Sequence, residues 1–335
     1  MDILLLNSTD ITDSLSMLDA IEVMRHGFRK TTKEHSQSPA RNHFYVEKKG
    51  INGQILIMPA LLKSIAGMSL KLSSIFPRNK NKNLPLIHAI IILMDVNNGK
   101  IKAIIEGSTL TSIRTGAVSG LATDLLARHD SKSLAIIGSG KQAKSQLEAV
   151  CSVRNIENIF IYSRNKSNAI TFSKTINLNE KIYINIKNII VTNIVSEAIV
   201  DADIICTATS TSSRDPIIEA KDIKEGTHIN AIGGVDESSC EIDPLLFNKS
   251  YIVVEQKEAA ILEAGEIIFS LKSGFISKDK IVELGEILSK TRASRESREQ
   301  ITIFKSVGLA IEDLFVSEWL FDKALKNNIG RLINL

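Results

Sequence analysis

Residues 134–143 read Leu-Ala-Ile-Ile-Gly-Ser-Gly-Lys-Gln-Ala, a short apolar run that leads into Gly-x-Gly-x-x-Ala, and a helical pattern follows. Gly138 permits the tight turn, Gly140 lets backbone N–H groups approach a pyrophosphate, and the small Ala143 keeps helix and strand close together. The N-terminus of the helix offers unpaired N–H donors and a positive dipole end to phosphates. Glycines also mark ordinary turns, but here the strand and the helix are both present. The motif predicts a dinucleotide site formed by Gly138, Ser139, Gly140, Lys141, Gln142 and Ala143.

A second apolar run, residues 158–162, ends at Ser163-Arg164-Asn165-Lys166. Ser163 stands near the position, about 20 residues past the glycines, where an acidic residue usually binds the adenosine ribose. The sequence has no acid there. A donating hydroxyl and neighbouring cations suit a 2′-phosphate, so we assign Ser163, Arg164 and Lys166 to cofactor binding. They favour NADP(H) over NAD(H), and the alternatives are NAD(H) and a solvated basic loop.

Apolar strands alternate with helical patterns between residue 131 and about residue 255. This alternation predicts an α/β fold with a parallel, doubly wound sheet of the Rossmann type. The polar loop that begins at Thr207 would lie at the carboxyl end of a strand, where such sheets bind ligands. The further residues assigned to cofactor binding are Thr207, Ala208, Thr209, Ile232, Gly233 and Ser306. The expected strands cover residues 134–138, 158–163, 187–192, 203–207, 227–233 and 250–254, and the expected helices cover residues 141–152, 166–176, 194–201 and 243–247.

The first 115 residues lack the strand-helix-strand rhythm. An amphipathic helix that contains Met17 and Phe28 precedes several strand-like segments, and turn signals separate those segments. This pattern indicates an α+β region. A long amphipathic helix from near Gly308 to about Ala324 is expected to return and pack against this N-terminal half. The expected strands of the region cover residues 42–48, 53–58, 66–74, 86–95 and 101–106.

The composition is that of a soluble globular protein with room for two domains: 335 residues, 44% of them hydrophobic, 24% charged, and a net charge of +3. This mild charge gives no reason to expect a nucleic acid partner. The N-terminus lacks the basic segment of a signal peptide, and the apolar runs are too short to cross a membrane. Cys151, Cys206 and Cys240 are scattered, without a CxxC pair or a histidine at metal spacing. We expect a cytoplasmic protein with no metal site.

Three cations stand in apolar or turn settings: Arg41, Lys71 and Arg114. Taken singly, each is more often a surface charge or an ion-pair partner. Lys71 is the most informative of the three, because Leu70-Lys71-Leu72 places a charge in a strand-like run whose other residues are expected to be buried. Together the three side chains could hold a carboxylate, arginine by a bidentate fork and lysine as a point charge.

With these residues in view, the chain resembles the ornithine cyclodeaminase/mu-crystallin family over nearly its whole length. The resemblance implies a homodimer in which residues 1–117 and 309–335 form a substrate-binding, dimerising domain around a Rossmann domain of residues 118–308. It also implies that Arg41, Lys71 and Arg114 hold the substrate carboxylate. The family includes ornithine cyclodeaminase, an archaeal alanine dehydrogenase and ketimine reductases. The matching segments are Arg41–Lys48, Met58–Ala60, Lys71, Pro77, Pro85, Ser112–Ala117, the Gly138 turn, Thr227–Gly233, Glu283–Glu286 and Ile303–Asp313.

Two positions depart from the cyclodeaminase pattern. That pattern has a catalytic Asp after Gly-Gly, whereas this chain has Val235 there and Asp236 one residue later. It also has a Glu two residues before Met-Pro, near the substrate amines, where this chain has Leu56. A dibasic substrate such as ornithine is therefore less well served.

The sequence thus predicts an NADP(H)-preferring oxidoreductase that interconverts a 2-imino and a 2-amino acid by hydride transfer at the α carbon. Asp236 is the candidate for proton exchange with the imine nitrogen, directly or through water, although it can equally be an ordinary loop acid or helix cap. Lys71 is counted with it as catalytic. The alternatives are an ornithine cyclodeaminase, a biosynthetic dehydrogenase of N-substituted amino acids, and a non-catalytic, cofactor-dependent binding protein of the crystallin type.

Overall fold

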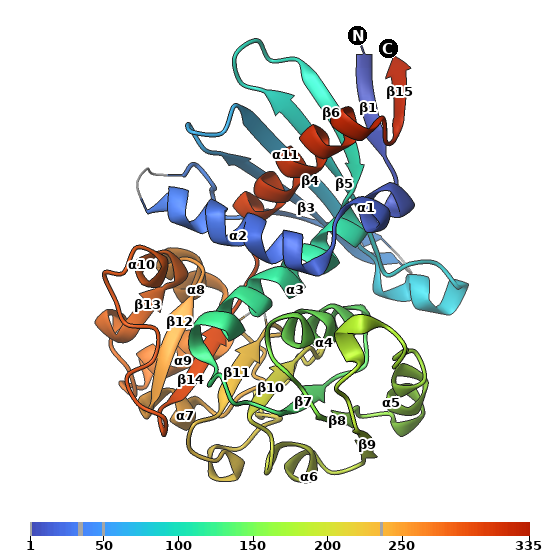
Figure 1. Ribbon diagram of the computed structural model, residues 1–335. Helices are drawn as coiled ribbons and strands as arrows, with labels where there is room; N and C mark the ends of the chain where they lie inside the picture. Colours follow the sequence, from blue (N-terminus) through green and yellow to red (C-terminus); the bar gives the residue numbers. More distant parts are fainter. Residues whose placement is uncertain (1, 33–35, 49–50, 235–236) are drawn as a thin grey trace. The chain divides into compact units, whose positions relative to one another are not determined.

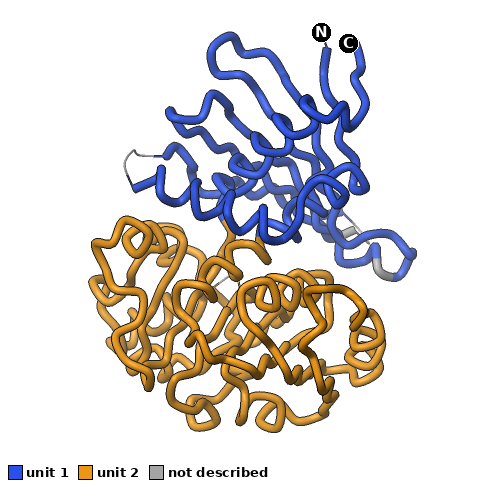
Figure 2. The backbone as a smooth tube through the Cα atoms, in the orientation of Figure 1, with its two compact units in different colours: residues 1–114, 309–335 blue, residues 115–308 orange. Residues whose placement is uncertain are grey.

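The computed structural model describes residues 2–32, 36–48, 51–234 and 237–335. The chain forms two compact units (Figure 2). Unit 1 comprises Met1–Arg114 together with Leu309–Leu335, and unit 2 comprises Thr115–Gly308. The second unit is therefore inserted into the first, and the C-terminal segment returns to the N-terminal one.

Unit 2 contains an eight-stranded parallel sheet in the order β13-β12-β14-β11-β10-β7-β8-β9. From β7 the chain proceeds outward to β8 and β9, then returns to β10 on the other side of β7. This arrangement confirms the predicted doubly wound α/β sheet, and the reversal between β7 and β10 is where such folds bind ligands. The strands are β7 (Ser133–Ile137), β8 (Asn158–Tyr162), β9 (Asn188–Thr192), β10 (Ile204–Thr207), β11 (His228–Ala231), β12 (Ser250–Val254), β13 (Ile281–Glu283) and β14 (Ile301–Lys305).

The helices of unit 2 follow the predicted alternation with shorter bounds in two places. The expected helix 166–176 ends at Ser173, and the expected helix 194–201 is one short turn. The expected strand 227–233 stops at Ala231, because the backbone N–H of Gly233 bonds a side chain rather than a neighbouring strand. The helices are α4 (Lys141–Val153), α5 (Lys166–Ser173), α6 (Val195–Ile199), α7 (Pro244–Asn248), α8 (Lys257–Glu263), α9 (Gly265–Lys272) and α10 (Leu284–Leu288), with 3-10 turns η2 (Lys181–Tyr183), η3 (Ala220–Asp222) and η4 (Lys278–Lys280).

Helix α3 (Gly107–Leu126) was not predicted, and it runs from unit 1 into unit 2. Glu106 starts it, since its carboxylate accepts hydrogen bonds from the N–H groups of Ser108 at 2.8 Å and Thr109 at 2.7 Å. Residues 115–123 are all buried. A helix buried on every side shows no amphipathic stripe, so its sequence gives no periodic signal.

Unit 1 contains a seven-stranded sheet in the order β15-β1-β6-β5-β4-β3-β2. The pair β1–β6 is parallel, and the other neighbours are antiparallel. Helix α11 lies across one face of the sheet (Figure 1), and α2 packs against α11, where Phe28 of α2 meets Phe315 of α11 edge to face. The elements are β1 (Asp2–Leu6), α1 (Ser8–Ser14), α2 (Met17–Thr31), β2 (Asn42–Lys48), β3 (Ile51–Leu61), β4 (Gly67–Ile75), η1 (Pro77–Lys82), β5 (Ile87–Asp95), β6 (Ile101–Glu106), α11 (Ala310–Asn327) and β15 (Arg331–Asn334).

The two faces of the unit 1 sheet differ in burial. Along β4, Ser69, Lys71 and Ser73 are buried, whereas Leu72 is exposed. Successive side chains of a strand point to opposite faces, so Lys71 points toward the face that α11 covers. The strand therefore places a cation under a helix.

No helix within the described ranges combines the length and the apolar character needed to cross a membrane. In the same part of the chain, no group of histidine, cysteine and acidic side chains is arranged to hold a metal ion.

Candidate functional site

Lys71 lies in the middle of β4 and is 4% exposed. Its Nζ donates to Oδ2 of Asp313 at 2.9 Å and to Oγ1 of Thr111 at 3.3 Å. Asp313 is in the first turn of α11 and Thr111 is in the first turns of α3. Three elements that are far apart in the sequence thus meet at one ammonium group.

Arg114 lies on α3, one helical turn after Thr111, and is also 4% exposed. Its Nε donates to Oδ1 of Asp313 at 3.1 Å, and its Nη1 donates to Oε2 of Glu312. Glu312 and Asp313 are both fully buried. The arginine expected in the carboxylate site is therefore held by two adjacent carboxylates of α11.

Arg41 precedes β2 and is partly buried. Burial lowers the pKa of Lys71 to about 8, the charge of Asp313 opposes that shift, and the charges of Arg114 and Arg41 add to it. The structure thus brings the three predicted cations into one electrostatic group in unit 1, which we call the cation cluster (Arg41, Lys71 and Arg114).

Sequence reasoning gave no role to the two acids that hold the cluster. Glu312 and Asp313 lie in the segment Ile303–Asp313 that carries the family resemblance. The available signal was two consecutive acids in the first turn of a helix whose other residues are mostly apolar, because a buried acid needs a cationic partner.

Leu56 stands where the cyclodeaminase pattern has a glutamate. It is 7% exposed on β3, where Leu56 pairs with Ser73 and Met58 pairs with Lys71. Leu56 and Lys71 therefore belong to the same sheet face, two residues apart along the strands. Leu56 thus places an apolar side chain next to the cation cluster, where the cyclodeaminase pattern has a carboxylate.

In unit 2, Gly138 directly follows β7 with φ +119, a conformation that residues other than glycine rarely adopt. A Cβ on Gly138 would lie 2.4 Å from the carbonyl oxygen of Ala208, just past β10. The two loops at the reversal point of the sheet therefore touch backbone to backbone.

Gly140 is the N-cap of α4, and the reason for a glycine at this position differs from the reason at Gly138. Its φ is −82, and an added Cβ would meet no atom within 4 Å. No side chain caps the helix, and Lys141 in its first turn is exposed. Uncapped N–H groups beside open space suit a phosphate, while the fully buried Ala143 packs against the sheet. These residues fit a dinucleotide, with Gln142 turned aside to accept a hydrogen bond from Ser145.

The end of β8 carries the predicted ribose position. The hydroxyl of Ser139 donates to that of Ser163 at 2.9 Å, which links the glycine turn to the end of β8. Arg164 and Lys166 are exposed beside Ser163. Asn165 caps α5 through the N–H of Ser167, so the two cations flank a helix N-terminus.

The loops after β10 and β11 are joined by a residue that the sequence did not single out, Glu241. One of its oxygens accepts from the N–H of Thr209 at 2.8 Å and from the Thr209 hydroxyl at 2.6 Å. The other accepts from the N–H of Gly233 at 2.8 Å and from the hydroxyl of Thr207 at 2.6 Å. Glu241 is fully buried. Its carboxylate therefore fixes both loops predicted to bind the cofactor, and Ile232 connects one of them to β11.

Gly233 is held from its other side as well. Its carbonyl oxygen accepts from Nζ of Lys305, and Lys305 forms an ion pair with Glu266 at 3.1 Å in full burial. The adjacent Ser306 donates its hydroxyl to Glu255, whose pKa burial raises. The hydroxyl of Ser306 is thus engaged within unit 2. Val235 and Asp236, which follow this turn, lie outside the described residues.

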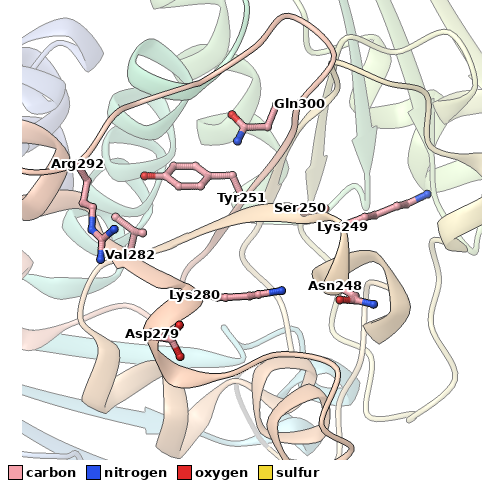
Figure 3. A pocket seen from close by; sticks show the side chains of 9 residues that line it. All are labelled: Asn248, Lys249, Ser250, Tyr251, Asp279, Lys280, Val282, Arg292 and Gln300. Atoms are coloured by element: carbon pink, nitrogen blue, oxygen red, sulfur yellow. The ribbon is translucent and has the colours of Figure 1, made fainter.

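A pocket of about 390 Å³ lies elsewhere on unit 2 (Figure 3). Its lining comes from residues that precede or begin β12, β13 and β14. It therefore lies at the amino ends of these strands, on the edge of the sheet opposite to Gly138 and Gly233, and no predicted site residue lines it. The lining residues are Asn248, Lys249, Ser250, Tyr251, Asp279, Lys280, Val282, Arg292 and Gln300.

Comparison with known proteins gives consistent matches over the whole chain. The Δ1-pyrroline-2-carboxylate reductase of Bacillus cereus is 37% identical over 334 residues, which cover 98% of this chain and 99% of that protein. A structure of the Thermococcus litoralis Δ1-pyrroline-2-carboxylate reductase in complex with NADH and L-proline matches with a TM-score of 0.90 and 38% identity, covering 99% of this chain and all of that one. An archaeal alanine dehydrogenase dimer with bound NAD matches with a TM-score of 0.87 and 32% identity over the full length of both chains.

The model of the ornithine cyclodeaminase/mu-crystallin family matches residues 1–328. The resemblance stated from the sequence motifs is thereby confirmed. The chain belongs to the ornithine cyclodeaminase/mu-crystallin family.

Proposed function

We propose that this protein is an NAD(P)H-dependent reductase that converts a cyclic 2-imino acid of the Δ1-pyrroline-2-carboxylate type into the corresponding 2-amino acid. Its class is an oxidoreductase that uses NAD(P) and acts on the carbon–nitrogen bond of amino or imino acids, in keeping with the relatives described above. The cation cluster carries the proposal, because buried cations on rigid elements suit a substrate carboxylate.

The apolar side chain next to the cation cluster favours a substrate with an uncharged ring over a dibasic substrate. Leu56 is buried on the same sheet face as Lys71. An apolar side chain can pack against the methylene groups of a ring, but it leaves a second amine without a partner. This disfavours ornithine as the substrate. At the position where the cyclodeaminase pattern has a glutamate, this chain has Leu56 and therefore no carboxylate.

The residues of the chain have two tasks in this reaction. Bound NAD(P)H would supply the hydride that the α carbon accepts. Lys71 and Arg114 orient the substrate through its carboxylate, which raises the effective concentration of the reacting carbon. With a pKa of about 8, Lys71 is mainly protonated at neutral pH and can also donate a proton toward the imine nitrogen. Asp236 is the second candidate for this proton transfer.

The cofactor preference that we propose is NADP(H) over NAD(H). Ser163 and two exposed cations, Arg164 and Lys166, follow β8 at the position where an acid would bind a free 2′-hydroxyl. A 2′-phosphate can accept charge-assisted hydrogen bonds from these groups. The relatives of known structure bind NADH or NAD, so a direct comparison of the two cofactors is decisive.

We also propose a homodimer in the cytoplasm. On the sheet face away from α11, Leu72 and Ile90 pair directly across β4 and β5, and each is 41% exposed. Ile57 pairs with Leu72 on the same face. An apolar sheet face of this kind typically marks a protein interface, and the archaeal alanine dehydrogenase is a dimer. The cysteines Cys151, Cys206 and Cys240 are free thiols, which suits a reducing compartment.

A substrate panel tests the reaction. The protein is incubated with NADPH and, in turn, Δ1-pyrroline-2-carboxylate, its six-membered homologue, and pyruvate with ammonia or methylamine; a parallel sample receives ornithine and NAD⁺. We expect the highest kcat/KM with a cyclic imine and L-proline as the product from the five-membered ring. Release of ammonia from ornithine without net cofactor turnover would instead show a cyclodeaminase. Turnover of pyruvate with methylamine alone would show a dehydrogenase of N-substituted amino acids, and no turnover with any substrate would show a binding protein.

A further inference from the structure

We propose that Asp313 is a positioning residue of the cation cluster, which binds one cation with each carboxylate oxygen and so fixes the spacing at which Lys71 and Arg114 meet the substrate. This inference rests on the proposed function and deepens it, because it names the group that makes two cations of distant elements act as one site.

The geometry is that of a bridging carboxylate. Oδ2 accepts from Nζ of Lys71 at 2.9 Å, and Oδ1 accepts from Nε of Arg114 at 3.1 Å. Asp313 is fully buried, and both cations are 4% exposed. A buried ion triad of this kind holds its members firmly, since removing one member leaves an uncompensated charge. Asp313 also lies in the first turn of α11, where the helix dipole favours a negative charge.

Asp313 leaves one N–H donor of Lys71 available for the substrate. An ammonium has three donors, and within the described residues two of those on Lys71 go to Asp313 and Thr111. The third can go to a substrate carboxylate without breaking either bond. Asp313 therefore orients the lysine rather than competing with the substrate for it.

The charges around Lys71 show what Asp313 contributes. Burial lowers the pKa of Lys71 to about 8, and Arg114 and Arg41 lower it as well. The charge of Asp313 and its hydrogen bond raise that pKa. Without Asp313, Lys71 would lose its proton at a lower pH. The neighbours of Lys71 on β3 and β5 are the apolar Met58 and Ile91, and Glu312 on α11 binds Arg114.

Asp313→Asn and Glu312→Gln form a matched pair of variants. Asparagine keeps the size of the side chain but replaces one acceptor oxygen by a donor and removes the charge, so Lys71 and Arg114 no longer each bind an oxygen of their own. Glutamine at position 312 makes the same chemical change to a neighbouring, equally buried acid that binds Arg114 but not Lys71. A general loss of stability would affect both variants, whereas a loss of lysine positioning would affect only the first.

The experiment measures the dissociation constant of pyrrole-2-carboxylate, a flat carboxylate that does not titrate between pH 6 and 10, for the wild type and both variants across that range. The same proteins are assayed for kcat/KM of imine reduction against pH. Thermal melting and NADH binding confirm that each variant is folded. The binding readout needs no turnover, so it tests Asp313 even if the proposed reaction is wrong.

For Asp313→Asn, we expect carboxylate binding to weaken about tenfold or more, and its loss at high pH to move down by about one pH unit or more. For Glu312→Gln, we expect the pH at which binding is lost to stay at its wild-type value. Equal pH profiles for the wild type and Asp313→Asn, or equal shifts in the two variants, would overturn the inference. An inactive wild type whose Asp313→Asn variant still shows the shift would overturn the proposed reaction and leave the inference standing.

Discussion

The backbone N–H of Gly233 donates to the buried carboxylate of Glu241 at 2.8 Å. Through this bond and those to Thr207 and Thr209, one side chain ties the loops after β10 and β11 together at the carboxyl edge of the sheet. Lys305 holds the carbonyl group of Gly233 from the other side. The hydrogen bonds of Glu241 and Lys305 thus fix the backbone of this turn.

Replacing Glu241 by glutamine should loosen these loops, because an amide has one acceptor oxygen where the carboxylate has two. We expect NADPH to bind about tenfold or more weakly, while 2′-phospho-ADP-ribose, which keeps the 2′-phosphate and lacks the nicotinamide, binds as it does to the wild type. The measurement is isothermal titration of both ligands. Asp203→Asn is the control, since Asp203 is a buried acid that binds Lys132 and Ser133 at the opposite edge of the same sheet. Equal losses for both ligands would show that Glu241 serves only stability.

The two glycines of the motif should respond differently to alanine. Gly138→Ala meets the carbonyl oxygen of Ala208 at a positive φ, so the free energy of unfolding should fall by more than about 1 kcal/mol. Gly140→Ala adds a methyl group to open space at an ordinary φ. Its melting temperature should stay at or above that of the wild type while its affinity for either cofactor falls. An unchanged cofactor affinity in Gly140→Ala would show that the pyrophosphate does not bind beside Gly140.

Arg164→Ala tests the cofactor preference. If the guanidinium binds a 2′-phosphate, NADPH should lose about 1.5–3 kcal/mol of binding free energy, and NADH should lose almost none. Lys174→Ala is the charge-matched control, because Lys174 is an exposed cation at the other end of α5. Fluorescence titration with both cofactors gives the two affinities. Equal affinities of the wild type for NADPH and NADH would contradict the preference.

The pH dependence of the wild type follows from Lys71. Its pKa is lowered from 10.5 to about 8, so it is protonated below that value and becomes neutral above it. Carboxylate binding and kcat/KM should therefore be highest below pH 8 and should fall as the pH rises through 8. Profiles measured with one substrate across this range check the prediction. A plateau up to pH 10 would mean that Lys71 keeps its proton or has no role.

Leu72→Asp should separate the proposed dimer. A carboxylate in the middle of an apolar interface is costly to bury, whereas on a solvent-exposed face it is tolerated. We expect a monomer by light scattering at concentrations where the wild type is a dimer. Lys63→Asp, at an exposed turn of the same unit, should stay dimeric. A dimeric Leu72→Asp variant would place the interface elsewhere.

The parts of this fold that the sequence predicts well are those with local signals. Gly138, Gly140 and the alternation around them identify the parallel sheet, because strand, turn and helix N-terminus lie within ten residues of one another. His228 stands inside an apolar run of the sequence, and it is buried with hydrogen bonds to Thr302 and Asn230. By contrast, α3 is buried on most sides and shows no periodic signal.

The partners of the candidate site residues could not be predicted in the same way. Asp313 stands 242 positions from Lys71 in the chain, and Glu241 stands 32 positions from Thr209. Nothing local distinguishes Glu241 from a surface acid, and Asp313 stands out only as one of two consecutive acids in the first turn of a mostly apolar helix. Their roles depend on which strands and helices become neighbours, and the sequence specifies that only through the complete fold.

The cation cluster is proposed to hold the carboxylate of an imino acid. This binding is tested most directly by comparing kcat/KM for Δ1-pyrroline-2-carboxylate and for Δ1-pyrroline, the same ring without the carboxylate, in the wild type and in Lys71→Met. We expect the wild type to prefer the carboxylated ring by about a thousandfold or more, and Lys71→Met to lose at least about tenfold of that preference. An equal loss of rate on both rings in Lys71→Met, with the preference unchanged, would show that Lys71 does not bind the substrate carboxylate.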